Sequence, residues 1–199
     1  MSFTHWMISK KTLTHRLTMH DILVVGAGSI GQRHIRCFLR TGRSRISVCD
    51  TDQTLLSRMQ EDYNVSHVYE NFTDSLLSQP EAVVLATPSD QHIPMAVQAA
   101  EAGCHLLIEK PLSTNFSGIE DLKKIVFQQQ LEAKVGYTFR HYPLVAKVKE
   151  EIEQRSWGLP LQLNIVSGQH FPTHRPAYRS IYYARHESGG GAVQDGLTH

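Results

Sequence analysis

The chain has 199 residues, of which 41% are hydrophobic and 20% are charged, and its formal net charge is +1. This profile is typical of a water-soluble globular protein with one well-buried domain and part of a second. The near-zero charge gives no electrostatic reason to expect a nucleic-acid or membrane partner, and no stretch approaches the roughly 20 apolar residues that span a bilayer.

The first 18 residues contain no acidic residue and many serines and threonines. This composition would suit an organelle transit segment, but Met19 stands directly before an apolar run and could itself be the start. We expect residues 1–20 to form an unstructured extension.

From residue 21 onward, apolar runs alternate with amphipathic stretches. The apolar runs are typical of parallel strands covered on both faces, and they predict strands at residues 22–28, 45–50, 65–69, 82–88, 105–111 and 133–139. The amphipathic stretches predict helices at residues 29–42, 52–62, 91–102 and 117–130. Strands that alternate with helices indicate βαβ units. The sequence therefore predicts an α/β fold, a doubly wound Rossmann sheet over residues 21–142.

The pattern changes after Pro143. A helix is predicted at residues 143–155, and residues 161–169 then alternate between polar and apolar, which predicts a strand with one solvated face. We expect residues 143–199 to be the beginning of an α+β sheet domain that follows the Rossmann domain.

Three glycines have the G-x-G-x-x-G spacing and lie between the first predicted strand and the first predicted helix, which is the required context. Gly26 would permit the tight turn, Gly28 would let the backbone approach a pyrophosphate, and Gly31 would let the helix pack closely on the strand. The N–H groups at the helix start, at Ser29 and Ile30, are candidate phosphate donors.

Asp50 ends the second predicted strand, 19 residues beyond Gly31. A carboxylate there can accept hydrogen bonds from both adenosine ribose hydroxyls and would repel a 2′-phosphate. Thr51 and Asp52 follow it rather than an arginine. The sequence therefore favours NAD over NADP, although a loop aspartate without a ligand is the alternative.

The three cysteines, Cys37, Cys49 and Cys104, show no paired-ligand spacing, and we expect a reduced, cytoplasmic protein. His170 and His174 have a spacing seen in metal sites, but no cysteine or carboxylate lies close to them in the sequence. No metal site is predicted.

Four motifs occur in order over residues 21–199: GAGSIGQRH, ATPSDQH, EKP and GGGAVQDGLTH. Together with GYTFRHYP, they resemble the glucose-fructose oxidoreductase and inositol dehydrogenase family, written Gfo/Idh/MocA. The resemblance implies a Rossmann domain followed by a sheet domain, with the nicotinamide facing the cleft between them.

Carried over motif by motif, the resemblance implies that Thr87, Pro88 and His92 line the nicotinamide side of the cofactor. Glu109, Lys110 and Pro111 would form the edge of the cleft. Glu109 and Lys110 would contact the cofactor, and Lys110 would also reach the substrate hydroxyl. The alternative for His92 is that it caps the helix that begins near it, and the alternative for Lys110 is a solvated lysine at the end of a strand.

The resemblance also implies that Asp195 and His199 are the family's D-x-x-x-H pair, that His199 exchanges the proton of the substrate hydroxyl, and that Arg140 lies nearby. Hydride removal from a carbinol carbon leaves an oxygen that must lose its proton, which suits a histidine. A lysine ammonium such as that of Lys110 stabilises the developing oxyanion. The catalytic candidates are therefore Lys110, Asp195 and His199.

The stretch HRPAYRSIYYARHESGGG resembles a loop in members that are linked to sugar or nucleotide-sugar metabolism. It suggests sugar contacts at Arg175, Tyr178, Arg179 and Tyr182, although ordinary packing between domains is an equal alternative.

The expected function is NAD-dependent hydride transfer to or from a hydroxyl carbon of a sugar, polyol or nucleotide-sugar. In the family the D-x-x-x-H motif lies mid-protein, so we expect the second domain to be incomplete and turnover to be absent or very low. Family members often associate through the sheet domain, so a homo-oligomer is an open alternative for a full-length parent. A non-catalytic NAD-binding fragment and a nucleotide-sensing protein are the alternatives.

Overall fold

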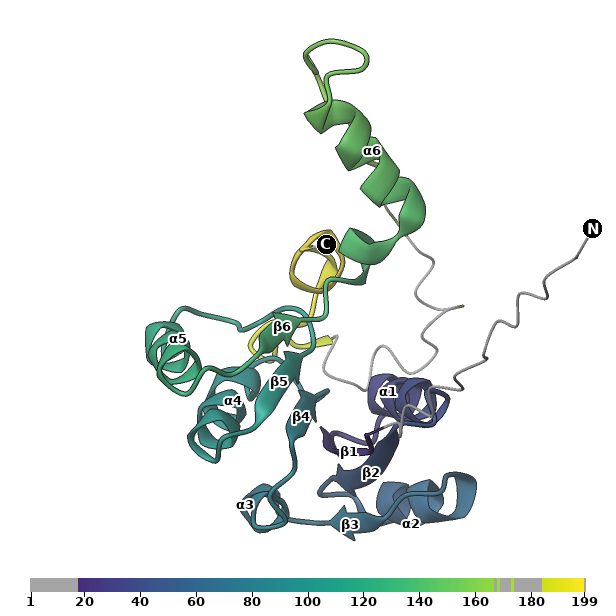
Figure 1. Ribbon diagram of the computed structural model, residues 1–199, viewed down its shortest axis with the longest axis vertical. Helices are drawn as coiled ribbons and strands as arrows, with labels where there is room; N and C mark the ends of the chain where they lie inside the picture. The colour runs from purple at the N-terminus through teal and green to yellow at the C-terminus, as the bar shows by residue number, and fades with distance from the viewer. Residues whose placement is uncertain (1–17, 167, 169–172, 174–183, 199) are drawn as a thin grey trace, which may run out of the picture.

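The computed structural model describes residues 18–166, 168, 173 and 184–198 (Figure 1). At its centre lies a six-stranded sheet in the order β3-β2-β1-β4-β5-β6, in which every neighbouring pair is parallel. The strands are β1 (His20–Val25), β2 (Ser44–Cys49), β3 (His67–Tyr69), β4 (Ala82–Leu85), β5 (His105–Ile108) and β6 (Ala133–Val135). The order reverses between β1 and β4, as in doubly wound dinucleotide-binding folds. The predicted Rossmann sheet is confirmed.

Strand β1 supplies buried side chains to both faces of the sheet. Ile22 and Val24 belong to one buried cluster, and Leu23 and Val25 belong to the other. Successive side chains of a strand point to opposite faces, so a strand covered on both sides is apolar at every position. This explains the uninterrupted apolar run in the sequence.

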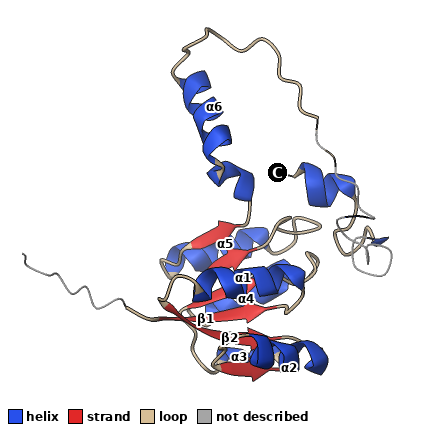
Figure 2. Ribbon diagram, turned by 90° about the vertical axis from the view of Figure 1, so that its right-hand side faces the viewer, coloured by secondary structure: helices blue, strands red, loops and turns tan. Residues whose placement is uncertain are grey.

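Helices cover both faces of the sheet (Figure 2). The cluster around Ile22 and Val24 is covered by α1 (Ser29–Leu39) and α2 (Gln53–Asp62). The opposite cluster is covered by α3 (Phe72–Leu76), α4 (His92–Glu101) and α5 (Ile119–Gln128). The short helix α3 was not predicted, because five residues are too few to show a helical period.

Next to the candidate site, two strands end earlier and one helix begins later than the sequence predicted. Strand β1 ends at Val25 and β5 at Ile108, so the glycine and EKP motifs lie in loops at the carboxyl edge of the sheet. Helix α5 begins at Ile119 rather than at residue 117, since Gly118 has a left-handed φ of 76° and cannot continue a helix.

Helix α6 (Pro143–Glu153) follows the short 3₁₀ helix η1 (Thr138–His141) and extends away from the sheet (Figures 1 and 2). Its apolar side chains Leu144, Val148 and Ile152 are spaced four residues apart and are 45–81% exposed.

Among the described residues, no helix is both long and apolar enough to cross a bilayer.

The strand predicted at residues 161–169 is wrong for residues 161–166, which have no regular secondary structure. Leu161, Leu163 and Ile165 are 75–97% exposed. An alternating sequence forms a strand only where a neighbouring strand satisfies its backbone hydrogen bonds, and the sheet of the described part of the chain ends at β6. The beginning of a second sheet is therefore absent from these residues.

The last described segment returns to the carboxyl edge of the sheet. The carbonyl oxygen of Ser188 accepts a hydrogen bond from the hydroxyl of Ser89, at 3.0 Å, and Gly189 and Gly190 are buried. A short π-helix, η3 (Ala192–Leu197), follows.

Candidate functional site

The glycine turn between β1 and α1 is shaped by two different steric demands. Gly26 has a φ of 93°, and a Cβ on it would lie 2.7 Å from the carbonyl oxygen of Ala86 in the neighbouring loop. A Cβ on Gly31 would collide with the carbonyl oxygen of Gly26. Both positions require glycine for packing within the protein, as the sequence predicted.

Gly28 differs from the other two glycines. Its φ is −67°, which any residue adopts, and no described atom would lie within 4 Å of an added Cβ. Packing within the described chain therefore gives no reason for glycine here, and the position is open to close approach by a ligand. Gly28 is the N-cap of α1 and has no side chain that could cap the helix. The N–H groups of Ser29 and Ile30, in the first turn, therefore have no partner within the helix and lie at the open position.

The carboxylate of Asp50 is fixed against this turn. Its Oδ2 accepts a hydrogen bond from the N–H of Ala27 at 2.6 Å, and its Oδ1 accepts one from the N–H of Asp52 at 2.9 Å. Each carboxylate oxygen has two acceptor sites, so both oxygens keep capacity for further donors. The acidic residue predicted to bind ribose is thus tied directly to the glycine turn.

His92, the first residue of α4, links two loops at the carboxyl edge. Its Nε2 lies 2.9 Å from the carbonyl oxygen of Thr87, after β4, and its Nδ1 lies 2.9 Å from that of Pro111, after β5. The ring is only 1% exposed. Burial lowers the pKa of His92 below its ordinary 6.5, although both carbonyls favour protonation. The N-cap position belongs to Gln91. The ring lies between the two loops, where a neutral imidazole donates to one of the two carbonyl oxygens.

Thr87 and Pro88 lie in the loop after β4. This loop lies next to the glycine turn, because its first residue, Ala86, is close to Gly26. The hydroxyl of Thr87 donates to the sulfur of Met95, at 3.8 Å. The contacts of Thr87, Pro88 and His92 with a nicotinamide stay predictions.

Glu109 follows β5, and its carboxylate is held by two donors. The Nε2 of His34 donates to Oε1 at 2.8 Å, and the N–H of Lys110 donates to Oε2 at 3.2 Å. Burial raises the pKa of Glu109, but the hydrogen bond and charge of His34, together with Lys110, outweigh burial and lower it below 4.5. Glu109 is therefore a carboxylate at neutral pH.

Sequence reasoning missed His34 as a site residue. It stands in the GAGSIGQRH motif, three residues after Gly31. Residues three apart share a face of a helix, and the face of Gly31 packs on the sheet. That spacing was the available signal for an inward-facing histidine.

The structure describes the remaining candidates only in part. Arg140 lies in η1 after β6 and is exposed, and the backbone of Asp195 lies in η3. The other candidates lie outside the described residues: His170, His174, Arg175, Tyr178, Arg179, Tyr182 and His199. Within the described part of the chain, no group of three histidine, cysteine or acidic side chains could hold a metal ion.

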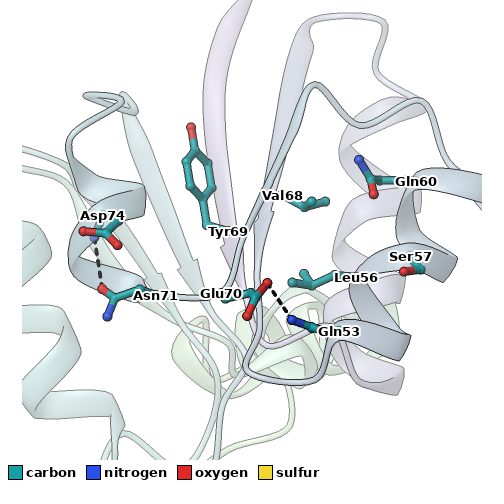
Figure 3. Close-up of a pocket in the computed structure, with 9 residues that line it drawn as sticks. All are labelled: Gln53, Leu56, Ser57, Gln60, Val68, Tyr69, Glu70, Asn71 and Asp74. Atoms are coloured by element: carbon teal, nitrogen blue, oxygen red, sulfur yellow. Dashed lines mark hydrogen bonds between the residues drawn. The ribbon is translucent and has the colours of Figure 1, made fainter.

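A separate hollow of about 420 Å³ lies at the outer edge of the sheet, between α2, β3 and α3 (Figure 3). Gln53 donates to Glu70 across it at 2.9 Å, and the side chain of Asn71 caps α3. The hollow is open and contains no predicted site residue. The predicted residues of the glycine turn, Asp50, Thr87 and Glu109 lie instead at the carboxyl ends of β1, β2, β4 and β5.

The family model described as "Oxidoreductase family, NAD-binding Rossmann fold" matches residues 20–137 of this chain. The chain belongs to the Gfo/Idh/MocA family. Among curated members, inositol 2-dehydrogenase of Corynebacterium glutamicum is 30% identical over 146 residues, which are 70% of this chain and 43% of that protein. The uncharacterized oxidoreductase YrbE of Bacillus subtilis is 26% identical over 88% of this chain and 50% of its own length.

Solved structures share the fold of this chain. The WlbA dehydrogenase of Bordetella pertussis, solved in complex with NADH and UDP-GlcNAcA, is 28% identical with a TM-score of 0.66 over 70% of this chain and 43% of its own. An NAD-binding protein from Listeria innocua has a TM-score of 0.72 over 92% of this chain and 52% of its own, at 22% identity. The chain spans about half the length of the curated relatives it matches.

Proposed function

We propose that this chain binds NAD at the carboxyl edge of its sheet and supplies the nucleotide-binding half of an oxidoreductase. Two observations together carry the proposal. The position at Gly28 is open, and the carboxylate of Asp50 is fixed beside the same turn by a hydrogen bond of 2.6 Å from the N–H of Ala27 to its Oδ2. A pyrophosphate would lie at the start of α1, and the ribose hydroxyls would donate to Asp50. The negative charge of Asp50 would repel a 2′-phosphate, which favours NAD over NADP.

The proposed substrate is a hydroxyl compound of the sugar, polyol or nucleotide-sugar class. The names of the relatives support this class, since they include inositol dehydrogenases and a dehydrogenase solved with UDP-GlcNAcA. When bound, NAD would accept the hydride from the hydroxyl carbon. The ammonium of Lys110 would stabilise the oxygen as it loses its proton, and His199, paired with Asp195, would take that proton.

A non-catalytic NAD-binding protein is the second candidate. The exposed apolar face of α6 and the exposed residues 161–166 favour it, because no described element covers them. The two candidates differ in turnover. Oxidation of sugars and polyols faster than about 1 per second would support the enzyme and exclude the non-catalytic protein.

The nucleotide site is tested by titrating the 199-residue chain with NADH and NADPH and following nicotinamide fluorescence. Asp50→Asn removes the charge and retains one oxygen, which can still accept from the N–H of Ala27 although the bond from Asp52 is lost. It therefore disturbs the glycine turn less than Asp50→Ala. We expect it to weaken NADH binding by about 10-fold or more and to narrow the preference over NADPH. Asp62→Asn is the matched control, because Asp62 is exposed at the end of α2.

Unchanged NADH binding in Asp50→Asn would contradict the role of Asp50. A wild-type chain that stays folded but binds neither nucleotide would contradict the proposed function itself.

A further inference from the structure

The contact between His34 and Glu109 joins two parts of the candidate site across the sheet. His34 lies in α1, whose first residues would carry the pyrophosphate, and Glu109 lies at the end of β5, directly before Lys110. Strand β4 lies between β1 and β5. The two side chains are 19% and 17% exposed, so the 2.8 Å contact is largely shielded from water and is worth more than a surface pair.

The hydrogen bonds to Glu109 show which atom of the His34–Glu109 contact carries the hydrogen. Both oxygens of Glu109 accept hydrogen bonds, one from His34 and one from the N–H of Lys110. A carboxylate is only an acceptor, so Nε2 of His34 must carry the hydrogen. Glu109 therefore has no proton to give, and its oxygens orient the groups around them.

Packing fixes both ends of the contact. The ring of His34 is stacked on Phe38 at a centroid distance of 6.4 Å and an interplanar angle of 30°. The carboxylate of Glu109 lies against the backbone of Gly136, where an added Cβ would be 3.2–3.3 Å from its oxygens. The N–H of Glu109 donates to the carbonyl oxygen of Leu85 at 2.9 Å. Both residues of the contact therefore have neighbours beyond each other.

We propose that His34 is a positioning residue that acts through Glu109. It fixes the backbone of Lys110 relative to the start of α1, and so holds the nicotinamide half of the dinucleotide in register with the lysine. This inference rests on the proposed function. The ADP half depends on the glycine turn and Asp50, which the contact does not include, so loss of the contact acts on the nicotinamide half alone.

The test compares the affinities of ADP and NADH in the wild-type chain, His34→Ala and His34→Gln. We expect His34→Ala to weaken NADH binding by about 10-fold and to reduce the fluorescence anisotropy of bound nicotinamide, while ADP affinity changes by less than about twofold. His34→Gln keeps an N–H donor near the position of Nε2 and is expected to restore most of the NADH affinity.

The matched control is His20→Ala. His20 also forms a hydrogen bond of 2.8 Å with a glutamate, Glu81, but that pair is exposed and lies at the amino edge of the sheet. We expect it to leave both affinities unchanged. Gly136→Ala is a second probe, since it pushes on the carboxylate of Glu109 without removing a polar group, and it should reproduce the selective loss of NADH affinity.

Equal weakening of ADP and NADH in His34→Ala, or unchanged NADH binding in both His34→Ala and Gly136→Ala, would overturn the positioning role while the proposed function stands. A folded wild-type chain that binds neither ADP nor NADH would overturn the proposed function and this inference with it.

Discussion

Ser89 and Ser188 are 99 positions apart in the chain, yet the hydroxyl of Ser89 donates to the carbonyl oxygen of Ser188 at 3.0 Å. Ser89 is 2% exposed, and the next residue after Ser188, Gly189, passes so close that an added Cβ would collide with the Ser89 side chain. This contact brings the segment that carries Asp195 to the loop of Thr87. The start of the GGGAVQDGLTH motif, at Gly189, thus lies against the loop that follows β4.

Gly189→Ala is expected to release this segment. Gly189 and Gly191 have φ values of 91° and 108°, so alanine at either position costs about 1–3 kcal/mol of backbone strain. Only Gly189 adds a collision, because no described atom lies within 4 Å of a Cβ on Gly191. Hydrogen exchange over residues 184–198 should therefore rise more in Gly189→Ala than in Gly191→Ala, and equal exchange in the two variants would contradict the contact.

Gly28→Ala and Gly31→Ala should separate ligand binding from folding. We expect Gly28→Ala to change the free energy of unfolding by less than about 0.5 kcal/mol, since its Cβ meets no described atom, but to weaken NADH binding because the Cβ occupies the open position. Gly31→Ala should cost about 3 kcal/mol or more, because its Cβ collides with the carbonyl of Gly26. Urea unfolding and NADH titration of both variants check this pair of outcomes.

The stability of the chain should depend on pH through His92. Burial lowers its pKa below 6.5 in the folded chain, so below that pH the unfolded chain binds a proton that the folded chain does not. The free energy of unfolding should therefore fall as the pH decreases from about 6.5, by at most about 1.4 kcal/mol per pH unit. Above that pH this ring contributes no pH dependence.

His92→Gln removes this titration and keeps an N–H donor. Urea unfolding of both proteins between about pH 5 and pH 8 should show a smaller acid slope in the variant. The same slope in both would mean that other groups account for the pH dependence.

The cysteines should react unequally with a thiol reagent. Cys37 is exposed, whereas Cys49 and Cys104 are 3% and 1% exposed. Burial raises the pKa of the Cys49 thiol to about 11 and also raises that of Cys104, and the thiolate is the reactive form. We expect one rapidly labelled thiol per folded chain and three in urea, counted by mass spectrometry.

The Rossmann sheet could be predicted because its strands and helices are each marked by a pattern within a few neighbouring residues. Runs such as Ile22–Val25 are apolar at every position, amphipathic stretches separate them, and chirality leaves few ways to join parallel strands through helices. The glycine spacing and Asp50 could be placed for the same reason, since both follow strands whose carboxyl ends meet at one edge.

The predicted strand at residues 161–169 failed because alternation is a conditional signal. Residues 161–166 have the polar and apolar pattern of a strand, but a strand also needs a neighbour in space, and pattern alone cannot supply one. His34 was missed for a related reason. Its identity and its position in the motif were visible, but its partner, Glu109, lies 75 positions away.

The sequence by itself determined the order and type of the Rossmann elements and the residues of the nucleotide motif, because periodicity and turn chemistry act within a few residues. Only the tertiary structure decided which groups far apart in the sequence meet: His34 with Glu109, His92 with the loop of Pro111, and Ser89 with Ser188. The first two contacts depend on how strands β1, β4 and β5 pair in the sheet, and the third depends on where the last described segment returns to the sheet edge. No local pattern in the sequence specifies these positions.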